Sequence, residues 1–400
     1  MKILPLNHAG ILKELGRYAC SVGSSFWAVG GCVRDWKLGL KNKDLDLVST
    51  QYPASIAAYC VEKWGGELEK FDRFGTCRVF LDNGLRLDFV RARREKYPKP
   101  AVLPEVSPGS FRDDLARRDF SVNAIAVDLQ PDNFGEVADI HGGLADIEKR
   151  SLRILHEKSF RDDPTRLYRL ARFAGRFGWK PDGTTLGLVR EAVAKGYPAL
   201  LSRERLKNEL WRVLEERYPV PALMLMKKWD ILKFIHPALR CNYGISASAE
   251  PAARLGIIAA GMKDDGRHFL ESLQLERSLC LQLKNAFGIL RNKACSKTRL
   301  SGLEKEIIVN SLKNLPACSL KPLFLNGSDL KKAGIPPGRK YSLILDDAAR
   351  AQWKEEFFSR QSALVWLKKR LSGTLRRAAG TAARLRRNIS ASSFAYRRRK

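Results

Sequence analysis

Two aspartates separated by one residue are the first candidates for chemistry in this 400-residue chain. Asp44 and Asp46 alternate with leucines in an apolar run that predicts a β-strand over 45–48. Residues i and i+2 of a strand share a face, so both carboxylates point the same way. Such carboxylates repel unless a cation lies between them, and hard oxygen ligands suit Mg²⁺. An Asp-x-Asp alone is more often a solvated strand face, so its neighbours must decide.

A pair of glycines precedes this strand. The short apolar segment 26–29 predicts a strand that runs into Gly30 and Gly31, where a helix is expected to begin. Backbone without Cβ can approach a phosphate closely, a helix N-terminus offers free N–H groups, and Arg34 adds a fork of donors. The alternative is a turn that merely needs glycine. A glycine turn followed by a two-carboxylate strand is more informative than either part.

Asp88 is a possible third acid. Residues 77–81 and 85–90 flank Asn83-Gly84, a strong signal for a β-hairpin, and Asp88 points outward on its second strand. If that strand lies beside the first, Asp88 could join the metal site as the base for an attacking hydroxyl. An unrelated exposed acid is an equal alternative.

Unusual residues gather again in the segment 114–124. Adjacent Arg117 and Arg118 suit phosphate, while Asp119 and Asn123 are residue types that hold ribose hydroxyls. A surface ion-pair cluster is the alternative reading of this segment.

A helix predicted over 164–177 carries arginines at three- and four-residue spacing: Arg166, Arg169, Arg172 and Arg176. Asp163 is a good N-cap before Pro164, yet it also lies three residues from Arg166, so the two are expected to meet on one face. A carboxylate beside a guanidinium matches the amino group and ring nitrogen of cytosine or adenine. Uracil and guanine would be rejected, because they present a carbonyl there. Capping and base reading are compatible.

The charge of the chain indicates a polyanionic partner. There are 72 Lys+Arg against 43 Asp+Glu, a net charge of +29. Nucleic acid is the favoured target and an anionic membrane surface is the weaker alternative. From 357 to 400 there is no acidic residue, and beyond about 372 we expect a disordered or weakly helical tail.

Composition and periodicity predict the organisation of the chain. No apolar run is long enough to span a membrane, the N-terminus lacks a signal-peptide core, and eight Cys without a CxxC pair suit a reducing, cytoplasmic setting. Residues 1–140 mix strand and helix signals, including a strand over 122–129. Helical periodicity then dominates, at 202–214, 222–234, 252–262 and 274–290. The expected fold class is α+β, with a mixed-sheet head followed by helices.

The order of these motifs resembles the tRNA nucleotidyltransferase / poly(A) polymerase family, class II of the nucleotidyltransferase superfamily. The matching pieces are Gly30-Gly31-x-x-Arg34-Asp35, Asp44-x-Asp46, Arg117-Arg118-Asp119-Phe120-x-x-Asn123, Asp139-x-x-Gly142-Gly143, Asp162-Asp163-x-x-Arg166, the helix 202–214, and Leu325–Leu330 with Gly334 and Pro337-Gly338. The resemblance implies a polymerase-β-like head at 1–140, a helical neck for base recognition at 141–215, a helical body and tail that bind tRNA at 216–370, and a basic tail at 371–400.

The resemblance also implies residue roles. Asp44 and Asp46 would hold Mg²⁺. Gly30, Gly31, Arg34 and Arg118 would contact the triphosphate, and Asp119 and Asn123 the ribose. Asp163 and Arg166 would select the base, supported by Arg169 and Arg172, and 139–143 would be a flexible joint. Asp162 departs from the family's usual Glu, which could alter how the neighbouring pair is tuned between bases.

The implied reaction is attack of an RNA 3′-hydroxyl on the α-phosphate of CTP or ATP, releasing pyrophosphate, with the tRNA 3′ acceptor end as substrate and no protein partner. Members add CC, A, all of CCA, or poly(A). The segment 93–104 fills a loop that CC-only members shorten, which favours addition of the terminal A. The alternatives are a poly(A) polymerase and, from a different class, a non-catalytic RNA-binding protein on this scaffold.

Overall fold

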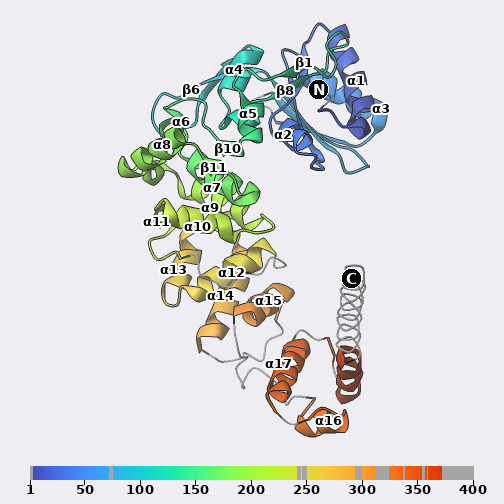
Figure 1. Ribbon diagram of the computed structural model, residues 1–400, viewed down its shortest axis with the longest axis vertical. Helices are drawn as coiled ribbons and strands as arrows, with labels where there is room; N and C mark the ends of the chain where they lie inside the picture. The colour runs from blue at the N-terminus through green and yellow to red at the C-terminus, as the bar shows by residue number, and fades with distance from the viewer. Residues whose placement is uncertain are drawn as a thin grey trace, which may run out of the picture. The chain divides into compact units, whose positions relative to one another are not determined.

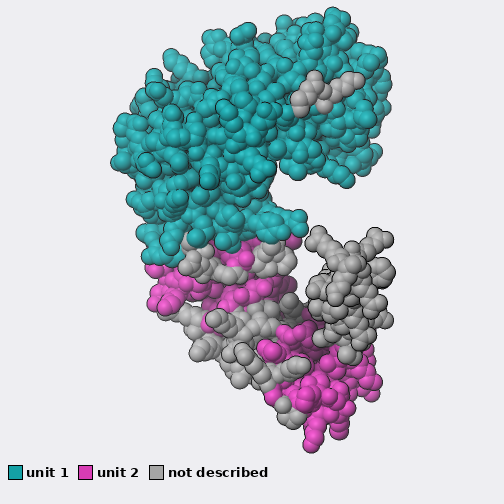
Figure 2. Space-filling model, in the orientation of Figure 1, with its two compact units in different colours: residues 1–241 teal, residues 242–400 magenta. Residues whose placement is uncertain are grey.

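The computed structural model describes residues 3–71, 75–240, 245, 250–292, 300–311, 324–336, 338–353, 356–357 and 359–371. The chain divides into two compact units, residues 1–241 and 242–400 (Figure 2). Within the described residues, no helix is long and apolar enough to cross a bilayer.

A seven-stranded mixed sheet forms the N-terminal head (Figure 1). Its strand order is β3-β4-β5-β2-β1-β8-β9; β2 and β5 are parallel, and the other neighbours are antiparallel. The strands are β1 (Phe26–Val29), β2 (Asp44–Ser49), β3 (Glu67–Phe71), β4 (Thr76–Phe80), β5 (Arg86–Arg91), β8 (Ala126–Asp128) and β9 (Val137–Ala138). The expected α+β class with a mixed-sheet head is confirmed.

The chain enters β2 from a glycine turn and a short helix, α2 (Gly31–Lys37). Leu45 and Leu47 of β2 are buried, as their alternation with the aspartates predicts. The hairpin expected around Asn83-Gly84 joins β4 to β5. Because β5 is the parallel neighbour of β2, Asp88 lies directly opposite Asp46 in the register.

Helices and a second ribbon surround this sheet. Helices α1 (Leu6–Ser21) and α3 (Pro53–Trp64) pack against each other and against strands of the sheet. A two-stranded ribbon, β6 (Arg93–Lys96) and β7 (Glu105–Pro108), leads into α4 (Phe111–Ala116).

The strand predicted over 122–129 is too long. A 3₁₀ turn, η2 (Ser121–Asn123), occupies its first residues, and only Ala126–Asp128 pair as β8. The buried side chain of Asn123 forms hydrogen bonds with Asp119 and Arg34. These bonds hold the residue in a turn instead of in a β-strand.

The rest of the first unit is helical apart from the two-residue strands β10 (Ser151–Leu152) and β11 (Lys180–Pro181). Its helices are α5 (Gly143–Glu148), α6 (Ser159–Asp162), α7 (Thr165–Phe177), α8 (Gly183–Ala194), α9 (Arg203–Leu214), α10 (Val220–Lys228) and α11 (Leu232–Ile235). The helix predicted over 222–234 is broken, because Asp230 adopts a positive φ of 59° between α10 and α11. The expected boundaries at 140 and 215 fall inside this unit and stay predictions.

In the second unit, α12 (Pro251–Gly261) and α14 (Arg277–Asn292) confirm two predicted helices. They pack with α13 (Asp265–Ser272) and α15 (Gly302–Ser311). Further on, Asn326 and Asp329 form a capping box at the start of α16 (Gly327–Lys332), and α17 (Arg339–Trp353) follows. Pro337 and the basic tail beyond 371 lie outside the described residues.

Candidate active site

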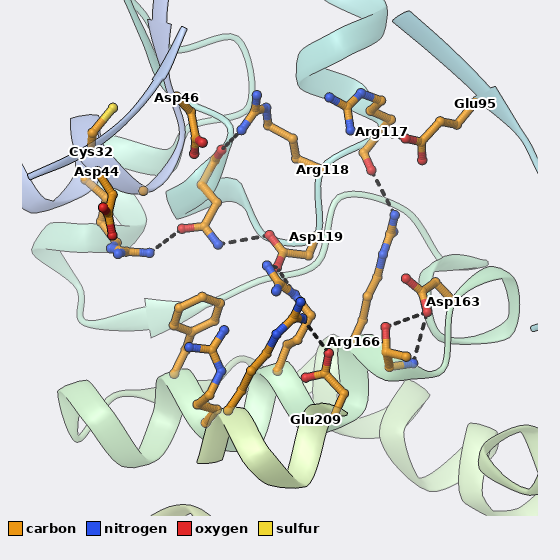
Figure 3. Close-up of a pocket in the computed structure, with 18 of the residues that line it drawn as sticks. Cys32, Asp44, Asp46, Glu95, Arg117, Arg118, Asp119, Asp163, Arg166 and Glu209 are labelled. Carbon is orange, nitrogen blue, oxygen red and sulfur yellow. Dashed lines mark hydrogen bonds and ion pairs between the residues drawn. The ribbon is translucent and has the colours of Figure 1, made fainter. Parts of the chain in front are cut away.

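One cavity in the first unit, of about 720 Å³, brings together the motifs singled out above (Figure 3). Asp44 and Asp46 lie at one side of it, and Asp163, at the end of α6, and Arg166, in α7, lie at the other. Among the described residues that line it, arginines outnumber carboxylates. The cavity is therefore suited to an anionic ligand that also needs a place for a cation.

The glycine turn is shaped by an arginine. Gly30 has a φ of 77°, which an L side chain rarely adopts, and a Cβ there would lie 2.4 Å from Nη1 of Arg118. Glycine thus permits both the turn and the close approach of this guanidinium. Gly31 begins α2 beside it and lines the cavity.

The two carboxylates of β2 differ in their surroundings. Asp44 is exposed and forms an ion pair with Arg86, with 3.4 Å between Nε and Oδ1. Asp46 is half-buried; its burial raises its pKa, Asp88 and Asp44 raise it further, and Arg118 and Arg86 oppose the shift. A carboxylate disfavoured in this way gains from a cation.

The donor set fits a divalent cation of the Mg²⁺ type. In the described part of the chain, no group of three or more His, Cys, Asp or Glu residues is placed to hold a metal. The protein offers the two hard oxygen ligands Asp44 and Asp46 at the edge of an open cavity. Mg²⁺ commonly takes one or two carboxylates and completes its shell with substrate phosphates and water.

Asp88 has the position required of a third acid, but it is already engaged. Nε of Arg78 lies 2.6 Å from its Oδ1, and Nε of Arg86 lies 3.7 Å from its Oδ2. It is not among the described residues that line the cavity. A catalytic role for Asp88 stays a prediction.

A buried chain of hydrogen bonds links the glycine turn to α7. Arg34 donates to Oδ1 of Asn123 over 2.5 Å, Asn123 donates to Oδ1 of Asp119 over 2.9 Å, and Arg169 donates to Oδ2 of Asp119 over 2.8 Å. Although burial opposes it, Arg169 and Asn123 lower the pKa of Asp119 to about 2. Hydrogen bonds thus connect Arg34, predicted to contact the triphosphate, through the predicted ribose residues to Arg169, predicted to support base selection.

Four guanidiniums lie around the ring of Phe173. The guanidinium carbons of Arg34, Arg169, Arg172 and Arg176 lie 4.6–5.8 Å from its centroid. Arg172 and Arg176 also share the carboxylate of Glu216. Cation–π contacts and this buried acid let the positive charges lie close together before any ligand arrives.

Asp114 holds the adjacent arginines Arg117 and Arg118 and was missed as a site residue at the sequence level. It is fully buried and accepts hydrogen bonds from both guanidiniums over 2.7–3.0 Å. Burial opposes the shift, but Arg118 and Arg117 lower its pKa. Nε of Arg118 is buried without a hydrogen-bond partner among the described residues, so this donor is available to a phosphate.

Asp163 and Arg166 line the same cavity but do not meet as their spacing predicts. Arg166 donates to Oγ of Ser159 over 2.7 Å and to the backbone oxygen of Arg117 over 2.8 Å. Asp163 instead accepts from Arg205 and from the backbone and hydroxyl of Thr165. Their spacing predicts that the two side chains share a face, but each has a hydrogen-bond partner on another element.

Glu95, Tyr97 and Glu209 also line the cavity, although the sequence predicts no role in the site for them. Glu95 accepts from Arg93, Arg117 and Tyr97, whose hydroxyl lies 3.0 Å from Oε2. Glu209, on α9, is buried beside Arg212, and burial raises its pKa. An acid on the apolar face of a helix was the available signal for Glu209.

Known proteins share this architecture. Residues 26–153 match the family model described as the Poly A polymerase head domain. An A-adding tRNA nucleotidyltransferase of Geobacter sulfurreducens is 36% identical over 236 residues, which are 59% of this chain and 27% of the relative. A CC-adding tRNA nucleotidyltransferase of Deinococcus radiodurans is 39% identical over 219 residues, which are 54% of this chain and 57% of the relative.

Among solved structures, the Thermotoga maritima CCA-adding enzyme complexed with tRNA matches with a TM-score of 0.60 and 25% identity. That match covers 92% of this chain and 97% of the other. By contrast, the sequence match spans about a quarter of the length of the Geobacter relative and just over half of the Deinococcus relative.

Proposed function

We propose that the chain is a member of the tRNA nucleotidyltransferase / poly(A) polymerase family and that it adds C or A from CTP or ATP to the 3′ end of tRNA without a template. The observation that carries this proposal is the single cavity that joins the carboxylates of β2, the arginines of the glycine turn and the base-reading residues of the neck. No nucleic-acid template would be needed, because protein groups of this cavity would face the phosphates, ribose and base of the nucleotide.

Enzymes of this family generally use divalent metals. We assign the metal position to Asp44 and Asp46 and the ion to Mg²⁺, in line with their hard oxygen donors and the raised pKa of Asp46. When bound, Mg²⁺ would supply charge neutralisation for the triphosphate and lower the pKa of the attacking 3′-hydroxyl. Arg118, with its unpartnered Nε, would hold a phosphate oxygen, and Arg34 would fix the turn of Gly30 and Gly31 beneath it.

The ribose and base would lie along the network that leads to α7. Asp119 and Asn123 would face the ribose, Arg169 would keep Asp119 ionised, and Arg172, paired with Glu216, would support the arginine face of α7. Asp163 would accept the exocyclic amino group that cytosine and adenine share, and Arg166 would donate to the ring nitrogen beside it. Uracil and guanine would be rejected because two oxygens would then face each other.

Within this activity we favour addition of the terminal A. Eight residues, 97–104, join β6 to β7, where CC-adding members are expected to have a shortened loop, and the Geobacter relative is an A-adding enzyme. The net charge of +29 suits the phosphates of the tRNA acceptor arm, the proposed partner.

The test is direct. The purified protein is incubated with Mg²⁺, each labelled nucleoside triphosphate, and one of four RNAs: tRNA ending before CCA, tRNA ending in CC, complete tRNA, or oligo(A). Incorporation of A onto tRNA ending in CC supports the proposal in its specific form. Incorporation of neither C nor A into any tRNA contradicts it, and extension of oligo(A) would indicate a poly(A) polymerase instead.

A further inference from the structure

The glycine turn and the strand that carries the proposed metal ligands are joined by a short connection. Helix α2 begins in that turn and carries Arg34, and β2 carries Asp44 and Asp46. Only residues 38–43 lie between the helix and the strand. The proposed reaction needs a cation on the strand and a phosphate at the turn at the same time. The spacing between these two groups therefore depends on the connection.

Asn42, in this connection, bonds both the strand and the helix. Its side-chain oxygen Oδ1 accepts from the backbone N–H of Asp44, at the start of β2, over 2.7 Å. Its side-chain nitrogen Nδ2 donates to Oδ2 of Asp35, in α2, over 2.8 Å. An amide carries an acceptor and a donor in one plane, so a single side chain holds the two elements together.

Asp35 extends this contact to the arginine of the turn. Its other oxygen, Oδ1, accepts from Nε and Nη2 of Arg34 over 2.9 and 2.7 Å. Arg34 is 3% exposed, and its remaining nitrogen, Nη1, donates to Asn123. A continuous path of hydrogen bonds thus runs through four residues that all line the cavity: Asp44, Asn42, Asp35 and Arg34.

The backbone of the connection has supports that do not depend on the Asn42 side chain. The backbone oxygen of Asn42 accepts from Nε2 of buried His8, in α1, over 3.2 Å. Burial lowers the pKa of His8, so the ring is neutral at pH 7, and Nε2 carries the proton because a carbonyl oxygen only accepts. The backbone oxygen of Lys43 accepts from the N–H of Arg86 over 2.8 Å. Replacing the Asn42 side chain should therefore leave the connection in place.

We infer that Asn42 is a positioning residue that links the metal ligand Asp44 to Arg34 at the phosphate turn, so that the gain in triphosphate affinity caused by the cation depends on this side chain. The path fixes the spacing of the two groups before either ligand binds, and such a link contributes a coupling free energy between the two binding steps. The effect on ligand binding rests on the proposed function, whereas the path itself consists of contacts between protein groups.

The experiment compares Asn42→Ala with Asn83→Ala, a matched control in the head. Asn83 also accepts from an N–H two residues further on, that of Leu85, over 2.9 Å. Unlike Asn42, it is not among the described residues that line the cavity. Calorimetry measures the affinity for a non-hydrolysable CTP analogue in EDTA and in saturating Mg²⁺. The affinity gain caused by Mg²⁺ should fall about tenfold in Asn42→Ala and stay within about twofold of wild type in Asn83→Ala.

A purely structural role of Asn42 predicts a different result. A destabilised protein would lose active molecules in both conditions, so its affinity gain would match that of wild type. Loss of the coupling should instead leave the affinity in EDTA within about twofold of wild type and lower only the gain. In an Asp35→Ala background, where the path is already broken, Asn42→Ala should lower the gain no further. A further tenfold fall there would mean that Asn42 contacts the ligands itself, which would overturn the positioning role.

Hydrogen exchange followed by mass spectrometry tests the contacts without any ligand. Exchange at the start of β2 should accelerate about tenfold in Asn42→Ala, because the N–H of Asp44 loses its acceptor, and should be unchanged there in Asn83→Ala. Asn42→Ser keeps a hydroxyl that can accept from Asp44 but is too short to reach Asp35. It should therefore exchange slowly and still lack the affinity gain, and it also serves if the alanine variant does not fold.

The outcomes separate the inference from the proposed function. If the wild type binds no nucleotide, the proposed function fails, and exchange at the start of β2 still decides whether Asn42 holds the strand. Faster exchange with an unchanged affinity gain overturns the coupling. A reduced gain in Asn42→Ala with unchanged exchange overturns the path through Asp44, and wild-type behaviour in both measurements overturns the whole inference.

Discussion

The two ends of the cavity neutralise their charges in opposite ways. At the neck end, near α7, Asp119 and Asp163 each accept a hydrogen bond from an arginine, and guanidiniums contact the ring of Phe173. At the sheet end, Asp44 is exposed with one longer ion pair, and Asp46 has a raised pKa. Asp119 and Asp163 are thus already paired with arginines, whereas Asp46 would gain from an added positive charge.

This difference matches the two tasks of the proposed reaction. Base selection requires donors and acceptors held in fixed directions, which a network of buried ion pairs supplies. Binding a metal with a triphosphate requires carboxylates that are not already paired with protein cations. In the free protein these carboxylates repel each other. Substitutions at the two ends should therefore affect activity and stability differently.

The largest expected effect is on catalysis at the sheet end. Asp46→Asn should lower the rate of nucleotide addition to tRNA by about 10³-fold, because one of two metal ligands loses its charge. The measurement is single-turnover incorporation of labelled ATP. Asp82→Asn, in the hairpin turn after β4, is the control and should react at the wild-type rate. If Asp46→Asn also reacts at the wild-type rate, Asp46 has no part in catalysis.

The next effect concerns selectivity at the neck end. Asp163→Asn should reduce the preference for ATP and CTP over UTP and GTP by roughly 10²-fold, since an amide can donate to the carbonyl that a carboxylate repels. Competition between labelled triphosphates measures the ratio. Asp230→Asn, at the exposed joint of α10 and α11, should not change it. Unchanged selectivity in Asp163→Asn would contradict base reading by this residue.

A smaller effect is expected on stability, from the network that holds Asp119. Asp119→Asn should lower the free energy of unfolding by about 2 kcal/mol at neutral pH. The pKa of Asp119 is depressed to about 2 from 3.8, so its contribution is fully present above pH 3.8 and is lost as pH falls towards 2. Urea unfolding of both proteins between pH 7 and pH 3 should show the difference narrowing only at the acid end.

The smallest effect has the opposite sign. The pKa of Asp46 is raised in the folded protein, so the protonated carboxyl stabilises the fold at low pH. This contribution to the free energy of unfolding is lost as the pH rises above 3.8 and the carboxyl ionises. Asp46→Asn should therefore unfold at a slightly higher temperature than wild type at pH 7. A lower midpoint would mean that the carboxylate is already compensated in the free protein.

Local patterns predicted much of this arrangement. Alternation identified β2, the Asn83-Gly84 signal identified the β4–β5 hairpin, and three- and four-residue spacing identified α7. The partners of the site residues could not be predicted in this way, because they come from distant parts of the chain. Arg34 and Asn123 are 89 positions apart, and Ser159 rather than Asp163 receives a bond from Arg166.

Asp163 and Arg166 illustrate the same limit, because among the described residues each bonds a partner other than the one predicted from their spacing. Spacing in one helix shows which side chains share a face, but not which groups of other helices reach that face first. Asp114 and Glu95 were missed for the same reason, since their role is to hold arginines that the sequence assigned directly to a ligand.

The central claim is that the carboxylates of β2 hold a divalent cation together with the triphosphate. Binding of Mn²⁺, measured by electron paramagnetic resonance with a non-hydrolysable CTP analogue, tests it most directly. We expect Mn²⁺ affinity to fall at least about tenfold in Asp46→Asn and to be unchanged in Asp82→Asn. Equal affinity in wild type, Asp46→Asn and Asp82→Asn would contradict the account.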